Sequence, residues 1–174
     1  PQSSEKMNAL LVQTNLLPEQ KEWSGAASIA PHKQWQRIFS LLKEQKNQID
    51  LLVFPEGTVP FAADFCYCPL PILQTLWQEI FDFLPAEKNL LPKLQKPFAQ
   101  ESQGNWLVSN GYFAQLLANH FNCQVIAGLE ARQEQEIYNA GFSKPINLSS
   151  VINSSSDDFS FIISVERIAG NSAT

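Results

Sequence analysis

Leu51-Leu52-Val53-Phe54-Pro55-Glu56 predicts the centre of the main sheet. Its run of large apolar residues predicts a short strand buried on both faces, as in a parallel sheet. Pro55 has no backbone N–H to donate to a sheet ladder, so we expect the strand to end there. Glu56 then lies at the carboxyl edge of the sheet, where open α/β folds place their chemistry. A partly desolvated carboxylate there is a candidate general base; the simpler interpretation is a surface acid that opens a turn.

The segments before this strand predict a βαβ unit. Residues Asn8–Thr14 form an apolar run typical of a first strand. Between Lys33 and Asn47, apolar residues recur on one face of an amphipathic helix, namely Trp35, Ile38, Phe39 and Leu42. Strand, helix and strand with short joints predict that the two strands are parallel neighbours.

The remaining sequence continues a mixed pattern. We expect Pro71 to open a second helix and Ser109 to cap a third, whose apolar stripe ends at His120 in a core or capping role. Apolar runs predict strands at 124–129, 137–142 and 159–165, the first two joined by a hairpin turn. Residues 85–105 have no sustained period and are interpreted as a surface excursion. The predicted fold class is α/β (α+β).

Composition excludes several classes of protein. The chain has 174 residues, enough for one domain with its own core. A net charge of -5 with scattered Lys and Arg argues against a nucleic-acid partner. No segment approaches the roughly 18 consecutive apolar residues of a membrane span, and the polar start lacks the apolar core of a signal peptide. A start on Pro1 without an initiator Met indicates a piece of something longer.

The cysteines predict neither a disulfide framework nor a metal site. There are three of them, Cys66, Cys68 and Cys123, and an odd number excludes complete pairing. Cys66 and Cys68 are closer than the usual zinc pair, and neither histidine stands at ligand spacing from them. We therefore expect no metal and no cofactor. Cys123, just before an apolar strand, is interpreted as a small core residue.

Four motifs occur in one order along the chain. They are Val12-Gln13-Thr14-Asn15, Lys21-Glu22-Trp23, Phe54-Pro55-Glu56-Gly57-Thr58-Val59-Pro60, and Gly128 followed by Tyr138-Asn139-Ala140. Over roughly residues 8–142 the chain resembles the nitrilase (carbon–nitrogen hydrolase) superfamily. Within that superfamily it looks most like the nitrilase-like domain of the apolipoprotein N-acyltransferase family. Phe54 stands where that family typically has Trp, and Gly57 is a further departure.

The resemblance implies a fold and two site residues. The fold is an α-β-β-α sandwich, incomplete here, with a polar lead-in at 1–7, a partial carbon–nitrogen hydrolase domain at 8–165 and a non-homologous tail at 166–174. Glu56 corresponds to the superfamily's catalytic base, and Trp23 to a tryptophan that contributes to substrate binding. An incomplete sandwich would leave apolar faces such as Val125-Ile126 and Phe161-Ile162-Ile163 uncovered, so we expect poor solubility or oligomerisation.

The lysine and the cysteine nucleophile of the superfamily have no counterpart at the expected places. The segment Glu166–Asn171 contains no lysine, Lys144 comes too early in the order, and Cys66 follows the base too closely. We therefore expect a truncated fragment, inactive as given, of an enzyme that transfers an acyl chain from phospholipid to the N-terminal cysteine of lipoproteins. The parent enzyme would act at the periplasmic face of the bacterial inner membrane, held there by segments absent from this chain.

Two other interpretations stay open. One is a fragment of a soluble amidase or nitrilase that hydrolyses a small amide. The other is a non-catalytic α/β module retained for binding.

Overall fold

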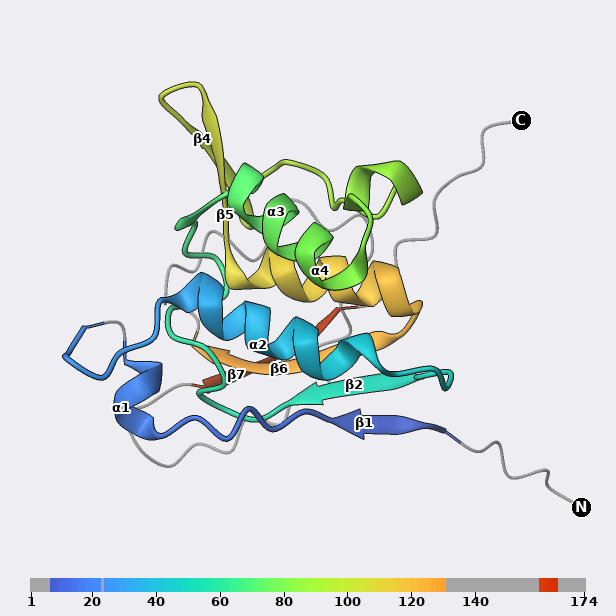
Figure 1. Ribbon diagram of the computed structural model, residues 1–174. Helices are drawn as coiled ribbons and strands as arrows, with labels where there is room; N and C mark the ends of the chain where they lie inside the picture. The colour runs from blue at the N-terminus through green and yellow to red at the C-terminus, as the bar shows by residue number, and fades with distance from the viewer. Residues whose placement is uncertain (1–6, 23, 131–159, 166–174) are drawn as a thin grey trace, which may run out of the picture.

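The computed structural model describes residues 7–22, 24–130 and 160–165 of the chain. It confirms the predicted mixed α/β class, with helices and two small sheets (Figure 1). The elements in chain order are β1 (Ala9–Leu11), α1 (Pro18–Lys21), α2 (Pro31–Lys43), β2 (Leu51–Phe54), β3 (Cys68–Pro69), α3 (Leu70–Phe81), the short 3-10 helix η1 (Pro85–Lys88), β4 (Ala99–Ser102), β5 (Asn105–Val108), α4 (Asn110–Phe121), β6 (Gln124–Glu130) and β7 (Ser160–Val165).

The main sheet has the strand order β1-β2-β6-β7. Strands β1, β2 and β6 are parallel, and β7 is antiparallel to β6. The predicted βαβ unit is confirmed, because β1 and β2 are hydrogen-bonded neighbours joined through α2. Helices α2 and α4 lie over one face of this sheet (Figure 1). Leu52, Phe54 and Val125 are buried on that face.

The opposite face of the main sheet carries an apolar row. Leu11, Val53 and Ile126 are aligned across β1, β2 and β6 by the strand register. Leu11 is 65% exposed, while Val53 and Ile126 are partly exposed. The expectation that Val125 and Ile126 share an uncovered face is wrong, because successive strand residues point to opposite faces and Val125 is fully buried. The side chains of 161–163 lie outside the described part of the chain.

The second sheet is antiparallel, with the order β3-β5-β4, and lies on the helix side of the main sheet (Figure 1). Strands β4 and β5 form a projecting hairpin. Gln103 and Gly104 at its tip both have positive φ, the geometry that two-residue hairpin turns require. Part of the segment expected as a surface excursion, 85–105, is therefore regular structure.

The three predicted helices are confirmed with shifted ends. Trp35, Ile38, Phe39 and Leu42 of α2 are buried. Pro71 lies in the first turn of α3. The helix ends at Phe81 and its C-cap residue Asp82 has a left-handed φ of 65°, so Leu84 lies beyond the helix. Ser109 occupies the N-cap position of α4, yet its hydroxyl is buried and makes no hydrogen bond among the described residues.

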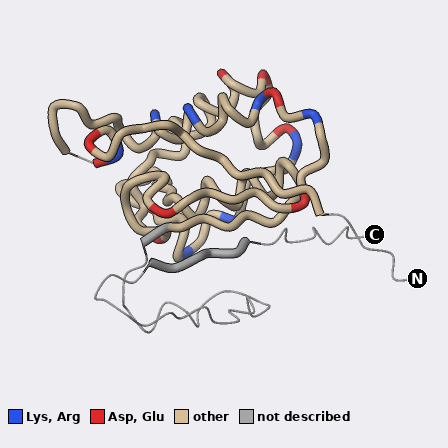
Figure 2. The backbone as a smooth tube through the Cα atoms, turned by 90° about the horizontal axis from the view of Figure 1, so that it is seen from below, with Lys and Arg blue, Asp and Glu red and all other residues tan. Residues whose placement is uncertain are grey.

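Charge is distributed over the described surface without a basic stripe. Figure 2 shows acidic and basic positions interspersed along the backbone. Within the described ranges, no helix has the length and apolar character needed to cross a bilayer. The predicted strand at 137–142 and its hairpin turn fall outside the described residues.

His120 takes the core role predicted for it. Its ring packs against aromatic rings at the ends of α3 and α4, with centroid separations of 5.0 Å to Trp77, 4.8 Å to Phe81 and 4.6 Å to Phe121. Burial, and then the nearby charge of Lys88, lower the pKa of His120 to about 4. The imidazole is therefore neutral in the folded protein at physiological pH.

This burial predicts a pH-dependent stability. The unfolded chain takes up a proton on His120 below its ordinary pKa of 6.5, whereas the folded chain does so only near 4. The free energy of unfolding should therefore fall as pH drops from 6.5 to 4. His120→Phe should remove this contribution, as measured by urea denaturation across that range. The comparison is His32→Gln at the partly buried start of α2, where burial also lowers the pKa, so this change should reduce the pH dependence in the same direction. Parallel pH curves for wild type and His120→Phe would contradict the prediction.

Candidate active site

Three parallel strands bring the motif residues to one edge of the main sheet. The carboxyl ends of β1, β2 and β6 lie together there, which is where open α/β sheets bind their ligands. Asn15 follows β1, Glu56 follows β2 after Pro55, and Gly128 lies within β6. Asn15 has φ 53°, a left-handed conformation that asparagine adopts more readily than most residues. The structure thus brings the first motif, the third motif and Gly128 of the fourth to the same edge of the sheet.

Gly128 touches the backbone of Glu56 directly. A Cβ atom at Gly128 would lie 2.6 Å from the Glu56 Cα and 2.8 Å from the Glu56 nitrogen. No side chain fits at these distances, so only glycine allows β6 to approach the end of β2 so closely. The position of the Glu56 backbone is therefore set by β6.

Two hydrogen bonds fix the loop after Glu56, one within its own turn and one from helix α4. Thr58 is buried, and its hydroxyl donates a hydrogen bond to the carbonyl oxygen of Pro55, which closes the turn. Further along, the amide of Gly111 donates to the carbonyl oxygen of Ala63 at 2.8 Å. The first bond closes the turn within the loop, and the second attaches the loop to α4.

Asn110, the first residue of α4, is the centre of a buried hydrogen-bond network. Its Oδ1 accepts hydrogen bonds from Trp35 Nε1 at 2.8 Å and from the Tyr67 hydroxyl at 2.9 Å. Its Nδ2 donates to the carbonyl oxygens of Pro60 at 2.7 Å and Phe61 at 3.1 Å. The side chain is 0% exposed, so all its polar atoms are satisfied inside the protein.

Glu56 itself is exposed, as are Pro55 and Gly57. The expectation of a partly desolvated carboxylate is therefore wrong, because nothing in the sequence around a strand end reports what covers it. Two open grooves lie along α2, one of about 300 Å³ toward α3 and one of about 270 Å³ toward residues 16–29, and Glu56 lines neither. Glu56 therefore stands outside both of these grooves.

Trp23 lies outside the described residues, but the loop that carries it is anchored. The buried side chain of Gln34 on α2 donates from Nε2 to the carbonyl oxygen of Ile29 at 2.8 Å and of Lys21 at 3.4 Å. These contacts tie both sides of the loop to α2. The role of Trp23 in substrate binding stays a prediction.

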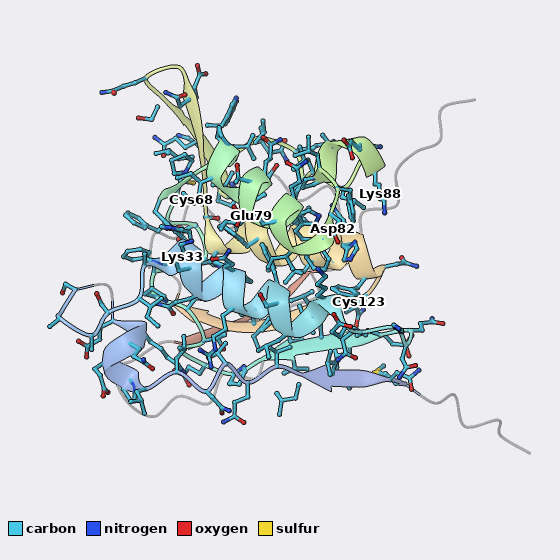
Figure 3. All side chains as sticks on the ribbon, in the orientation of Figure 1. Lys33, Cys68, Glu79, Asp82, Lys88 and Cys123 are labelled. Atoms are coloured by element: carbon cyan, nitrogen blue, oxygen red, sulfur yellow. The ribbon has the colours of Figure 1, made fainter. Side chains whose placement is uncertain are left out.

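The three cysteine thiols are all poor nucleophiles. Burial, followed by the charge of Asp64, raises the pKa of Cys66 to about 11. Burial raises the pKa of Cys68 to about 12, and burial with Asp50 raises that of Cys123 to about 11. Cys68 and Cys123 also lie far apart (Figure 3). Because the thiolate is the reactive form, each of these cysteines is inert at neutral pH.

Metal chemistry finds no support in the described part of the chain. No group of three or more His, Cys, Asp or Glu side chains there is arranged to hold a metal ion.

The sequence interpretation missed Asn110. The available signal was a polar residue directly after the Ser109 N-cap, at the start of an otherwise apolar helix. Its partners are distant in sequence, with Trp35 lying 75 residues away, so no local pattern could identify them.

Comparison with curated proteins finds two similar sequences. The chain is 31% identical over 112 residues to the apolipoprotein N-acyltransferase of Chlamydia caviae, which covers 64% of the chain and 17% of that protein. It is 28% identical over 111 residues to the apolipoprotein N-acyltransferase of Chlamydia pneumoniae, covering 63% of the chain and 17% of that protein. The matched region is thus a small part of each relative. No family model and no solved structure matches the chain.

The contact between Gly128 and Glu56 predicts the effect of one added methyl group. Gly128→Ala must push the backbone of Glu56 away, and overpacking of this kind costs about 1–3 kcal/mol. Urea denaturation should show this loss. Leu11→Ala is a control on an exposed position of the same sheet, where about 0.5 kcal/mol or less is expected. An unchanged midpoint for Gly128→Ala would contradict the close packing.

Proposed function

We propose that this chain is part of an apolipoprotein N-acyltransferase of the nitrilase superfamily, with Glu56 as its general base. The observation that carries the proposal is the place of Glu56 in the fold. It follows a buried parallel strand at the carboxyl edge of the sheet and is held there by Gly128, in a chain similar to two proteins of that name. Because Glu56 is exposed, partial desolvation does not support its role as a base. The support comes from its position at the strand end and from the similarity of the chain to the two relatives.

The proposed chemistry is acyl transfer in two steps. Glu56 takes the proton of a cysteine thiol, and the thiolate attacks the ester carbonyl of a phospholipid, releasing lysophospholipid and leaving a thioester. The α-amino group of a lipoprotein's N-terminal cysteine then attacks the thioester, and the thiol is regenerated. A lysine ammonium stabilises the negative charge that develops on the carbonyl oxygen in each step.

The nucleophile in this proposal comes from polypeptide outside these 174 residues. The raised pKa values of Cys66, Cys68 and Cys123 support this, because a carboxylate base removes the proton from such a thiol less readily than from an ordinary one. An exposed Glu56 is open to a thiol that approaches from elsewhere in the protein. The chain alone is accordingly expected to show no turnover.

The remaining assignments follow from the same proposal. Phospholipid is the acyl donor and an apolipoprotein the acceptor, and the reaction takes place at the periplasmic face of a bacterial inner membrane. Trp23 is assigned to the substrate-binding side of the site. No cofactor enters the scheme.

A chimera tests the role of Glu56. The matched segment of the Chlamydia caviae relative is replaced by the corresponding segment of this chain, and N-acylation of a diacylglyceryl peptide is followed with phospholipid vesicles. Glu56→Gln should lower kcat about 100-fold or more, because the amide cannot accept the thiol proton.

The matched control is Glu101→Gln, an exposed glutamate on β4. This variant should retain the activity of the unaltered chimera. An active chimera that tolerates Glu56→Gln as well as it tolerates Glu101→Gln would refute the assignment of the base.

A further inference from the structure

We propose that Asn110 is a positioning residue for Glu56, acting through the backbone of the loop that follows the base. This inference rests on the proposed function, because it assigns Asn110 a part in the same reaction. The side chain touches neither Glu56 nor any reacting atom, so its effect is transmitted through Pro60 and Phe61.

The two ends of the Asn110 amide serve different parts of the molecule. The oxygen accepts from Trp35 and Tyr67, whose rings belong to the aromatic core. Trp35, for example, stacks on Phe113 with ring centroids 4.8 Å apart. The nitrogen donates only to the loop. The oxygen end therefore fixes Asn110 to the core, and the nitrogen end fixes the loop to Asn110.

The loop needs such a clamp because its backbone is strained. Phe61 has φ 75°, a left-handed conformation that is a genuine outlier for a bulky residue. A conformation of this kind persists only where the surroundings determine it, and it clusters at functional sites. Asn110 Nδ2 binds the carbonyl oxygen of this same residue and that of Pro60.

The carboxylate of Glu56 depends on this backbone. Within the described residues, no hydrogen bond or ion pair holds its side chain, which is exposed. Its place is instead set on one side by the contact with Gly128 and on the other by the anchored loop. Loosening the loop should therefore displace the base without removing it.

Two variants separate the ends of the network. Asn110→Asp keeps the Oδ acceptors for Trp35 and Tyr67 but, as a carboxylate, loses both donations to the loop. Tyr67→Phe removes one donor to Oδ1 and leaves the loop contacts intact. Hydrogen exchange of the 174-residue chain, read by mass spectrometry on peptides that span 55–61, is measured for both.

Asn110→Asp should speed exchange in 55–61 about tenfold or more beyond any change in β6, because the backbone that the two lost hydrogen bonds held opens more often and exposes its amides. Tyr67→Phe should change exchange there no more than it changes exchange in β6. Asn110→Ser, which is neutral and too short to reach both carbonyl oxygens, replaces the Asp variant if that variant does not fold. Equal changes in 55–61 and β6 for all variants would overturn the inference.

Activity in the chimera provides the second readout. Asn110→Asp should lower kcat about tenfold and leave KM within about twofold, the pattern of a displaced base. Raised KM with unchanged kcat would overturn the positioning role. If an active chimera tolerates Glu56→Gln, the proposed role of Glu56 fails. The exchange experiment then still decides whether Asn110 holds the loop.

Discussion

The buried amide of Asn110 is the constraint on which the site depends. It links α2 through Trp35, the start of the second sheet through Tyr67, and the loop after β2 through Pro60 and Phe61. Each buried donor or acceptor left without a partner costs about 1–3 kcal/mol. The network therefore admits essentially one arrangement, in which the helix layer, the aromatic core and the loop beside Glu56 are fixed together.

Local patterns predicted the elements of this fold better than its connections. The 3.6-residue period of α2 and the apolar run of β2 are visible because each depends only on burial of one face or strand. The hairpin of β4 and β5 was missed because its tip and strand β4 are largely polar and exposed, so burial leaves no period there. Glu56 was correctly placed at the end of β2. Its exposure depends on segments distant in sequence, which no local pattern contains.

Burial keeps the ionisable groups of the core neutral, and this limits the chemistry of the chain. The pKa of each cysteine is raised and that of His120 is lowered by the same cause, the loss of water around a charge. Buried Tyr67 and Tyr112 likewise have raised pKa values. These groups hold the aromatic layers together as neutral side chains. Among the described residues, Glu56 at the strand edge is exposed and belongs to a different environment from these groups.

Glu56 and part of the apolar row on the sheet face opposite the helices are both exposed in the described part of the structure. The register aligns Leu11, Val53 and Ile126 on the face opposite the helices. Glu56 follows shortly after Val53 in the chain, at the carboxyl end of β2. An apolar row of this kind is stable when a second layer covers it, as in the sandwich that the family resemblance implies. In that arrangement, a layer packed on this face would also approach the carboxyl edge and exclude water from Glu56. Under the proposed function, burial of the apolar row and desolvation of Glu56 would then occur together.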